Sequence, residues 1–242
     1  MSTDERIYVG YLPMSGRLRT FTLIAVSALL LAGLVASGIV AYTLRRSGTG
    51  QWDTSQPVTL SGVARLRPYP HLETLDGPVL LAEPGKHGAQ GRTANIDGHE
   101  VMVTGTTLMR GTLRALEITE VSAPSGERVG PTSIELGADE ITLLGEILDS
   151  KCYLGAMKPG DGPTHKACAI LCLRGGIAPL FVGETEAGEV IVAVLCSPDG
   201  SPVSEEIIAF AGETVRVRGR IGTFGSLQVF AVAPGALPAA GD

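Results

Sequence analysis

The chain has 242 residues, which is enough for one large domain or two small ones. Its formal net charge is −6, and this acidic balance argues against a nucleic-acid-binding surface, because phosphates attract clustered Lys and Arg. The 32 glycines and 15 prolines are dispersed along the chain. Dispersed turn-forming residues indicate many short strands, so we expect a mainly β protein rather than a helical bundle.

The first predicted element is a transmembrane helix at residues 21–44, preceded by a cytoplasmic segment at residues 1–20. No charged residue occurs between Phe21 and Leu44, and a helix of this length crosses the roughly 30 Å hydrocarbon core of a bilayer. A cleaved signal peptide is the alternative, but its apolar region normally has only about 7–15 residues. We therefore expect an uncleaved, single-pass anchor in the membrane lipid bilayer.

Basic residues flank this span almost equally, so the positive-inside rule favours neither orientation strongly. The flanking arginines are Arg6, Arg17 and Arg19 before the span and Arg45 and Arg46 after it. A lone N-terminal span usually acts as a signal-anchor and leaves the long C-terminal part outside. We therefore place residues 47–242 on the exported face of the inner (cytoplasmic) membrane. In a bacterium this face is periplasmic, where thiols can oxidise to disulfides.

An internal repeat follows the anchor. Residues 98–118 align without gaps on residues 212–232, and each copy alternates apolar and polar residues on both sides of a glycine, which indicates a β-hairpin. The matched pairs are Gly98 and Gly212, Val101 and Val215, Val103 and Val217, Gly105 and Gly219, Gly111 and Gly225, and Leu113 and Leu227. Upstream, residues 58–62 resemble residues 141–145 in the same relative place. Two matches in the same order favour a duplication.

This layout predicts two tandem small β-barrels. The pattern resembles an OB-fold, a five-stranded barrel that holds oligonucleotides, sugars or, in membrane-anchored haem chaperones, haem. A β-sandwich would give nearly the same pattern. The predicted segments after the anchor are a linker at 45–56, a first barrel at 57–120, a linker at 121–139, a second barrel at 140–234 and a flexible tail at 235–242.

The second barrel is predicted to carry an insertion at residues 149–181. Gly145 and Gly212 are much farther apart in sequence than their matched residues, Gly62 and Gly98. The added residues include three of the four cysteines and one of the four histidines. Loops on a rigid barrel commonly carry binding and chemistry, so we expect the functional site in this insertion.

Within the insertion, the sequence predicts a short helix over residues 165–174. Thr164 is a suitable N-cap, and Gly175 and Gly176 are suitable residues to end the helix. The preceding residues contain Gly and Pro and are expected to form a loop.

Four side chains of the insertion are candidate metal ligands: Cys152, His165, Cys168 and Cys172. The last three lie within about 60° of one another on the predicted helix, and Cys152 ends the preceding strand. Such a set suits tetrahedral zinc, and thiolate-rich sites also suit copper or an iron–sulfur cluster. The positive end of a helix favours thiolates. The spacing matches no standard zinc finger, so the sequence does not select among these metals.

Three other interpretations of these cysteines stay open. A disulfide between Cys152 and either Cys168 or Cys172 would pin the insertion to the barrel, whereas Cys168 and Cys172 are poor partners within one regular helix. In a second interpretation, the cysteines serve only as small apolar side chains of a buried helix. An enzymatic alternative uses Cys168 as a nucleophile with His165.

Three of the four lysines, Lys151, Lys158 and Lys166, also lie in the insertion. They predict a basic rim that binds an anionic cofactor, headgroup or partner. A solvated loop is the alternative interpretation. Both interpretations place these side chains at the surface.

These features predict an exported, membrane-anchored accessory subunit that binds a metal or redox cofactor. We expect it to work with a protein partner in a membrane electron-transfer or assembly complex. The alternative is a disulfide-pinned β-barrel module that binds a protein partner without a cofactor. The sequence contains no G-x-S-x-G, HExxH, Walker loop or dinucleotide fingerprint, so a stand-alone enzyme is not expected.

Overall fold

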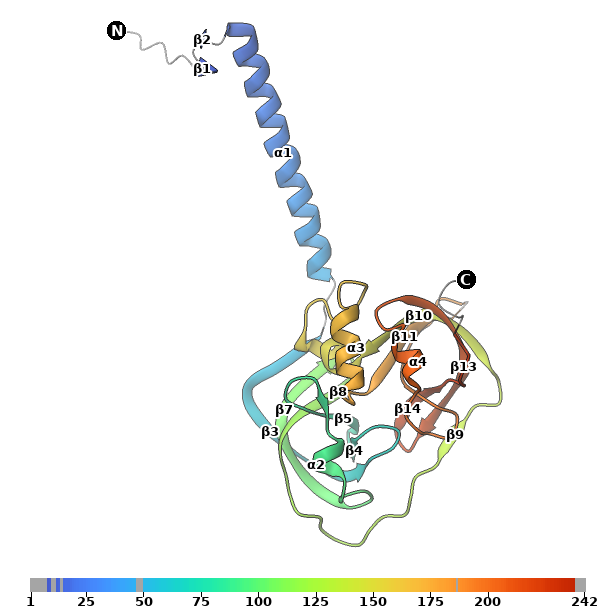
Figure 1. The fold of residues 1–242 in the computed structure, drawn as a ribbon. Coiled ribbons are helices and arrows are strands. Elements are labelled where there is room, and N and C mark those ends of the chain that lie inside the picture. Colours follow the sequence, from blue (N-terminus) through green and yellow to red (C-terminus); the bar gives the residue numbers. More distant parts are fainter. Residues whose placement is uncertain (1–7, 10–11, 14, 47–49, 186, 238–242) are drawn as a thin grey trace. The chain divides into compact units, whose positions relative to one another are not determined.

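The computed structural model describes residues 8–9, 12–13, 15–46, 50–185 and 187–237 (Figure 1). Contacts within the chain divide it into two compact units, residues 1–46 and residues 47–242. Much of the predicted cytoplasmic segment and most of the predicted tail lie outside the described residues. The two units are treated separately below.

The first unit is dominated by one apolar helix. This helix, α1, spans Gly16–Arg46 and follows a pair of short antiparallel strands, β1 (Tyr8–Val9) and β2 (Leu12–Pro13). Within α1, residues Gly16–Tyr42 are long and apolar enough to span a membrane, with a mean hydropathy of 2.5. The predicted N-terminal apolar helix is therefore confirmed, and α1 extends beyond residues 21–44 at both ends.

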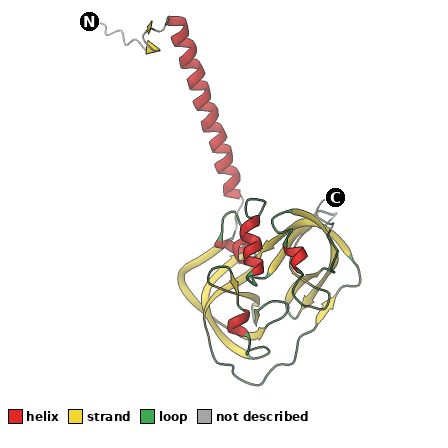
Figure 2. Cartoon of the chain, in the orientation of Figure 1, coloured by secondary structure: helices red, strands yellow, loops and turns green. Residues whose placement is uncertain are grey.

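The second unit is mainly β, as predicted (Figure 2). Its first sheet has the strand order β4-β3-β7-β8-β5-β6, and β4 also pairs with β5. Five of its strands are therefore hydrogen-bonded in a ring, called the first ring here. The strands are β3 (Gln51–Arg65), β4 (His71–Thr74), β5 (Gly77–Glu83), β6 (His87–Gly88), β7 (Glu100–Arg110) and β8 (Leu113–Val121).

The second sheet has the strand order β10-β11-β12-β14-β13-β9. Because β10 also pairs with β13, five strands form a closed β-barrel, called the second ring here. The strands are β9 (Ile134–Leu136), β10 (Ile141–Asp149), β11 (Pro179–Glu184), β12 (Val190–Cys196), β13 (Thr214–Phe224) and β14 (Leu227–Ala231). The sixth strand, β9, pairs with the end of β13 from within the segment predicted as a linker.

The pairings of the two rings correspond strand for strand. In each ring the first three strands form an antiparallel meander, and the third strand pairs in parallel with the last one, as β5 does with β8 and β12 with β14. The aligned segments 98–118 and 212–232 largely form the hairpins β7–β8 and β13–β14. Their turns contain Gly111 at φ +61° and Gly225 at φ +60°, a backbone region that glycine adopts readily.

Alternating side chains give each ring its own apolar core. Along β7 and β13, every second residue near the start of the strand is buried, which is the strand periodicity expected from the sequence. Leu72 and Leu116 are buried in the first ring. In the second ring, Phe181 and Phe230 pack with ring centroids 5.3 Å apart.

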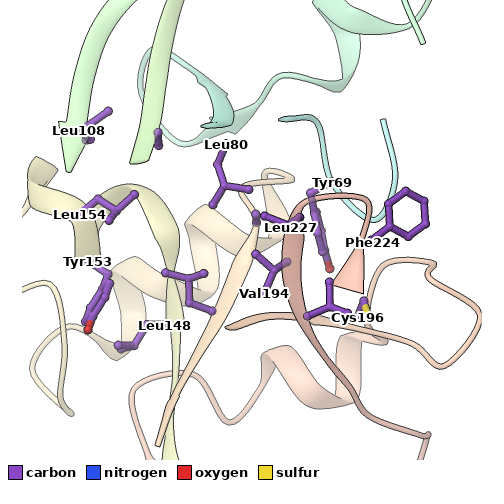
Figure 3. Packing of buried hydrophobic residues seen from close by; sticks show 14 of the residues in the cluster. Tyr69, Leu80, Leu108, Leu148, Tyr153, Leu154, Val194, Cys196, Phe224 and Leu227 are labelled. Carbon is purple, nitrogen blue, oxygen red and sulfur yellow. The ribbon is translucent and has the colours of Figure 1, made fainter. Parts of the chain in front are cut away.

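A third apolar cluster lies between the two rings (Figure 3). Leu80 and Leu108 contribute to it from the first ring, and Leu148 and Val194 contribute from the second. Cys196 is fully buried in the same cluster. The two rings therefore share one apolar cluster in addition to their separate cores.

The rings differ most in the connection between their first and second strands. In the first ring, residues 66–70 join β3 to β4, whereas residues 150–178 join β10 to β11. The long connection contains a short π-helix, η1 (Cys152–Ala156), and the helix α3 (Lys166–Arg174). The connections before β7 and β13 each contain one short helix, α2 (Gln90–Thr93) and α4 (Glu205–Ile208).

Candidate metal centre

Three thiols meet in the long connection of the second ring. The sulfur atoms of Cys152, Cys168 and Cys172 all lie within 4.8 Å of one another, and we call these residues the three-thiol group. Cys152 and Cys172 are buried, and Cys168 is half-buried. Their apolar neighbours include Ala82 and Ile177. Three soft donors are thus gathered in one place, as predicted for these cysteines.

Local structure explains why these sulfurs converge. Cys152 begins η1 three residues after Asp149, the last residue of β10, and its backbone N–H donates to Asp149 Oδ1 at 2.8 Å. Cys168 and Cys172 are one turn apart on α3, so their side chains share a face. The helix ends at Gly175 and at Gly176, whose φ is +92°. It starts at Lys166, so the predicted helix is correct to within one residue at its start.

His165 belongs to a second, overlapping group. Its Nε2 atom lies 2.9 Å from Asp149 Oδ2, and both side chains are buried. Ligand atoms of Asp149, Cys152 and His165 lie within 4.8 Å of one another. The four predicted ligands therefore form two groups that share Cys152, with Asp149 as an additional member. Asp149 ends a buried strand three residues before Cys152, which is the sequence signal that identifies it.

Lys86 of the first ring reaches the three-thiol group from the turn between β5 and β6. Its Nζ atom lies 2.7 Å from Cys168 Sγ and 3.7 Å from Cys172 Sγ. This turn is bound to the end of α3, because Gly88 N–H donates to the Gly175 carbonyl at 2.8 Å. Sequence reasoning missed Lys86, which is distant in sequence and is the one lysine outside the insertion.

Charge and hydrogen bonding separate the pKa values of the buried thiols. The pKa of Cys172 is lowered to about 7, first by a hydrogen bond from the Cys152 thiol and also by the positive charge of Lys86. The same hydrogen bond, together with burial, raises the pKa of Cys152. The bond to Cys168 raises the pKa of Lys86. These shifts favour a thiolate at Cys172 next to the Lys86 ammonium.

The three lysines predicted to bind a cofactor occupy different environments. Lys151 is buried, pairs with Glu117 and donates to the carbonyls of Glu83 and Gly85, each at 2.8 Å. Lys166 pairs with Glu213, and Lys158 is exposed. These hydrogen bonds hold the turn that carries Lys86, so Lys151 helps to position Lys86 next to the three-thiol group. A cofactor-binding role for these lysines stays a prediction.

The donor set can hold a metal ion. Thiolates, an imidazole and a carboxylate are all ligands of transition metals, and this set alone does not identify the metal. No disulfide joins any two of the four cysteines, all of which the structure describes. Comparison of the chain with protein families, curated proteins and solved structures finds no match. The class defined by fold and site is a mainly β protein with an apolar N-terminal helix and a thiol-rich candidate metal centre.

Proposed function

We propose that the three-thiol group binds one thiophilic metal ion. The observation that carries this proposal is the approach of all three sulfurs to within 4.8 Å. Sulfur ligands about 2.3 Å from a tetrahedral ion lie roughly 3.8 Å from one another. Small side-chain rotations therefore suffice to bind zinc or copper(I). An iron–sulfur cluster places several atoms between its thiolates, so its ligands lie farther apart, and a single ion fits better.

Charge supports the same proposal. An ammonium group, Lys86 Nζ, already lies against the sulfurs of Cys168 and Cys172, so the pocket attracts positive charge. A metal ion supplies more positive charge at closer range and displaces that ammonium. The carboxylate of Asp149 accepts a hydrogen bond from the Cys152 N–H and contacts the His165 ring nitrogen. We propose that Asp149 and His165 orient Cys152, as hydrogen-bonded carboxylates and histidines commonly orient metal ligands.

The rest of the chain suggests how this centre is used. We propose two tandem OB-like barrels derived by duplication, with the long connection as an insertion in the second. Their matching strand pairings support this view. The apolar helix α1 suits a single-pass anchor, with residues 47–242 on the exported face. We propose an accessory subunit in a membrane electron-transfer or assembly complex, where the metal centre transfers electrons or stabilises a partner-binding surface.

Metal analysis of the full-length protein in detergent tests the proposal. We expect one zinc or copper ion per chain in the wild type. Replacing Cys152, Cys168 or Cys172 with Ser should remove it, whereas Cys196→Ser should retain it. Cys196 is the matched control because it is buried, like Cys152 and Cys172, but lies in the core between the rings. A folded, metal-free wild type that takes up neither ion, or equal metal in Cys168→Ser and Cys196→Ser, would overturn the proposal.

Cobalt(II) substitution identifies the ligands more directly. Thiolate ligands give sulfur-to-cobalt charge-transfer absorption, which should weaken with each Cys→Ser change in the three-thiol group. Equal iron and acid-labile sulfide would instead indicate a cluster. Separately, protease digestion of intact spheroplasts tests the exported location, because residues 47–242 should be degraded without lysis.

A further inference from the structure

The distance between Lys86 Nζ and Cys168 Sγ is shorter than that of a normal hydrogen bond from nitrogen to sulfur. Lys86 Nζ lies 2.7 Å from Cys168 Sγ. Charge-assisted hydrogen bonds from nitrogen to oxygen measure about 2.7–2.9 Å, and sulfur is a larger atom than oxygen. A single oxygen atom, bonded covalently to both nitrogen and sulfur, spans a separation of this size.

We propose that Lys86 and Cys168 form an oxidative N–O–S link between the first ring and α3. This is a covalent modification site, and it does not depend on the proposed metal function. The link would connect the Nζ atom of Lys86 through one oxygen atom to the sulfur of Cys168. It would also withdraw Cys168 from the three-thiol group while it lasts.

The backbone around Lys86 is built to hold it against α3. A Cβ atom added at Gly175 would collide with the carbonyl oxygen of Lys86, so glycine is required for this approach. Gln90 Nε2 donates to the Gly176 carbonyl at 2.7 Å, and Lys151 holds the neighbouring carbonyls of Glu83 and Gly85. The backbone that carries Lys86 is thus held on both sides, which lowers the entropy cost of bringing its side chain to Cys168.

Exposure makes Cys168 the thiol of this group that an oxidant in solution reaches most easily. Cys168 is half-buried, whereas Cys152 and Cys172 are buried, and oxidation follows access of the oxidant to the thiolate. A disulfide between Cys168 and Cys172 is disfavoured within one turn of a regular helix. A disulfide with Cys152, whose sulfur lies within 4.8 Å, is the competing product, whereas the Lys86 nitrogen already lies 2.7 Å from Cys168 Sγ.

The reaction balances with a peroxide as the oxidant. The Cys168 thiol first attacks one hydrogen peroxide molecule, which forms an S–OH bond and releases water. The Lys86 ammonium then gives one proton to solvent, and its nitrogen bonds to that oxygen. A second peroxide molecule accepts two electrons, its O–O bond breaks, and it leaves as two water molecules with one hydrogen from the S–OH group and one from the amine. Sulfur and nitrogen each lose two electrons, and the two peroxide molecules become three molecules of water with the hydrogens of the thiol and the amine. Reduction by excess dithiol reverses the change and returns the bridging oxygen as water.

Peptide mass spectrometry of the full-length protein in detergent tests the link. Metal is removed with a chelator, and the protein is treated with hydrogen peroxide, alkylated and digested. We expect the peptides that contain Lys86 and Cys168 to be joined, with a mass one oxygen atom greater and two hydrogen atoms less than their sum. Treatment with dithiothreitol should separate them again.

Matched variants define the expected pattern. Lys86→Gln and Cys168→Ser should lose the joined peptide, whereas Lys158→Gln and Cys196→Ser should keep it. Disulfides within the three-thiol group alone, sulfinic acid without a link, or a joined mass that lacks the oxygen would each overturn the proposal. The readout in the wild type needs neither metal nor an altered fold, so failure of metal binding and failure of the link are separate results.

Discussion

His165 Nε2 lies 2.9 Å from Asp149 Oδ2, and ligand atoms of this buried pair lie within 4.8 Å of the Cys152 sulfur. The other carboxylate oxygen of Asp149 accepts the Cys152 N–H at 2.8 Å. One carboxylate therefore fixes both the imidazole and the backbone that carries the thiol. The pair links the end of β10 to the start of α3, the two elements that bring the sulfurs together.

The first prediction concerns this support. His165→Gln should weaken metal binding by about 10–100-fold, the usual effect of removing a group that orients a ligand. The number of reactive thiols after unfolding should stay the same. Competition with a chromophoric chelator measures the affinity, and His87→Gln is the control because His87 is exposed. Unchanged affinity in His165→Gln would remove this histidine from the site.

The second prediction concerns pH. In the reduced, metal-free protein, a thiolate should appear as pH rises through about 7 and disappear below it, because the pKa of Cys172 is lowered from 9.0 to about 7. Lys86→Gln removes a positive charge that favours the thiolate, so this transition should move to higher pH. Ultraviolet absorption of the thiolate measures it. Cys172→Ser should abolish the transition, and persistence of the transition in that variant would contradict the assignment.

The third prediction concerns two matched glycines. A Cβ atom at Gly62 would meet the carbonyl oxygen of Glu73, and one at Gly145 would meet that of Val182. Each of these carbonyl oxygens belongs to the neighbouring strand of the same ring. Gly62→Ala and Gly145→Ala should therefore each lower the free energy of unfolding by about 1–3 kcal/mol. Gly130→Ala is the control, because open space surrounds that position. Thermal unfolding in detergent measures the change. Unchanged stability in Gly145→Ala would show that the neighbouring strand can shift to make room for the added methyl group.

The fourth prediction concerns the buried ion pair of Lys151 and Glu117. Side-chain exposure is 5% for Lys151 and 15% for Glu117. Lys151→Met leaves that carboxylate and two carbonyls without their donor, so we expect a loss of about 3–5 kcal/mol. Adding Glu117→Gln to Lys151→Met should restore part of the lost stability, because it removes the unpaired buried charge.

The exposed Lys158→Met variant is the control for that change and should alter stability by less than about 0.5 kcal/mol. If Lys151→Met instead keeps full stability but loses an anionic ligand, Lys151 is a cofactor-binding residue.

Local patterns predicted much of this molecule from sequence. The absence of charge predicted the apolar helix, and alternation around Gly111 and Gly225 predicted both hairpins. The helix of the insertion follows from its cap signals and from Gly175 and Gly176. Each of these features is decided within a few residues, so the sequence alone contains the physical cause.

Long-range pairings account for what the sequence did not reveal. Lys86 and Cys168 meet only because the turn after β5 contacts the end of α3, and no spacing rule relates them. Likewise, β9 pairs with β13 although its segment reads as a linker. His165 pairs with Asp149 because the connection between β10 and α3, which contains η1, brings the start of α3 back to the end of β10. Such contacts depend on how finished strands pack, which local propensity does not determine.

The placement of Lys86 in the first ring and of the cysteines in the second has a consequence for biogenesis. During synthesis Lys86 is made before the three cysteines, but its ammonium reaches their sulfurs only when the turn between β5 and β6 contacts the end of α3. Their full environment arises only after the second ring closes and docks. A newly made molecule therefore passes through an interval in which its cysteines are most vulnerable to mispairing and to unsuitable metals.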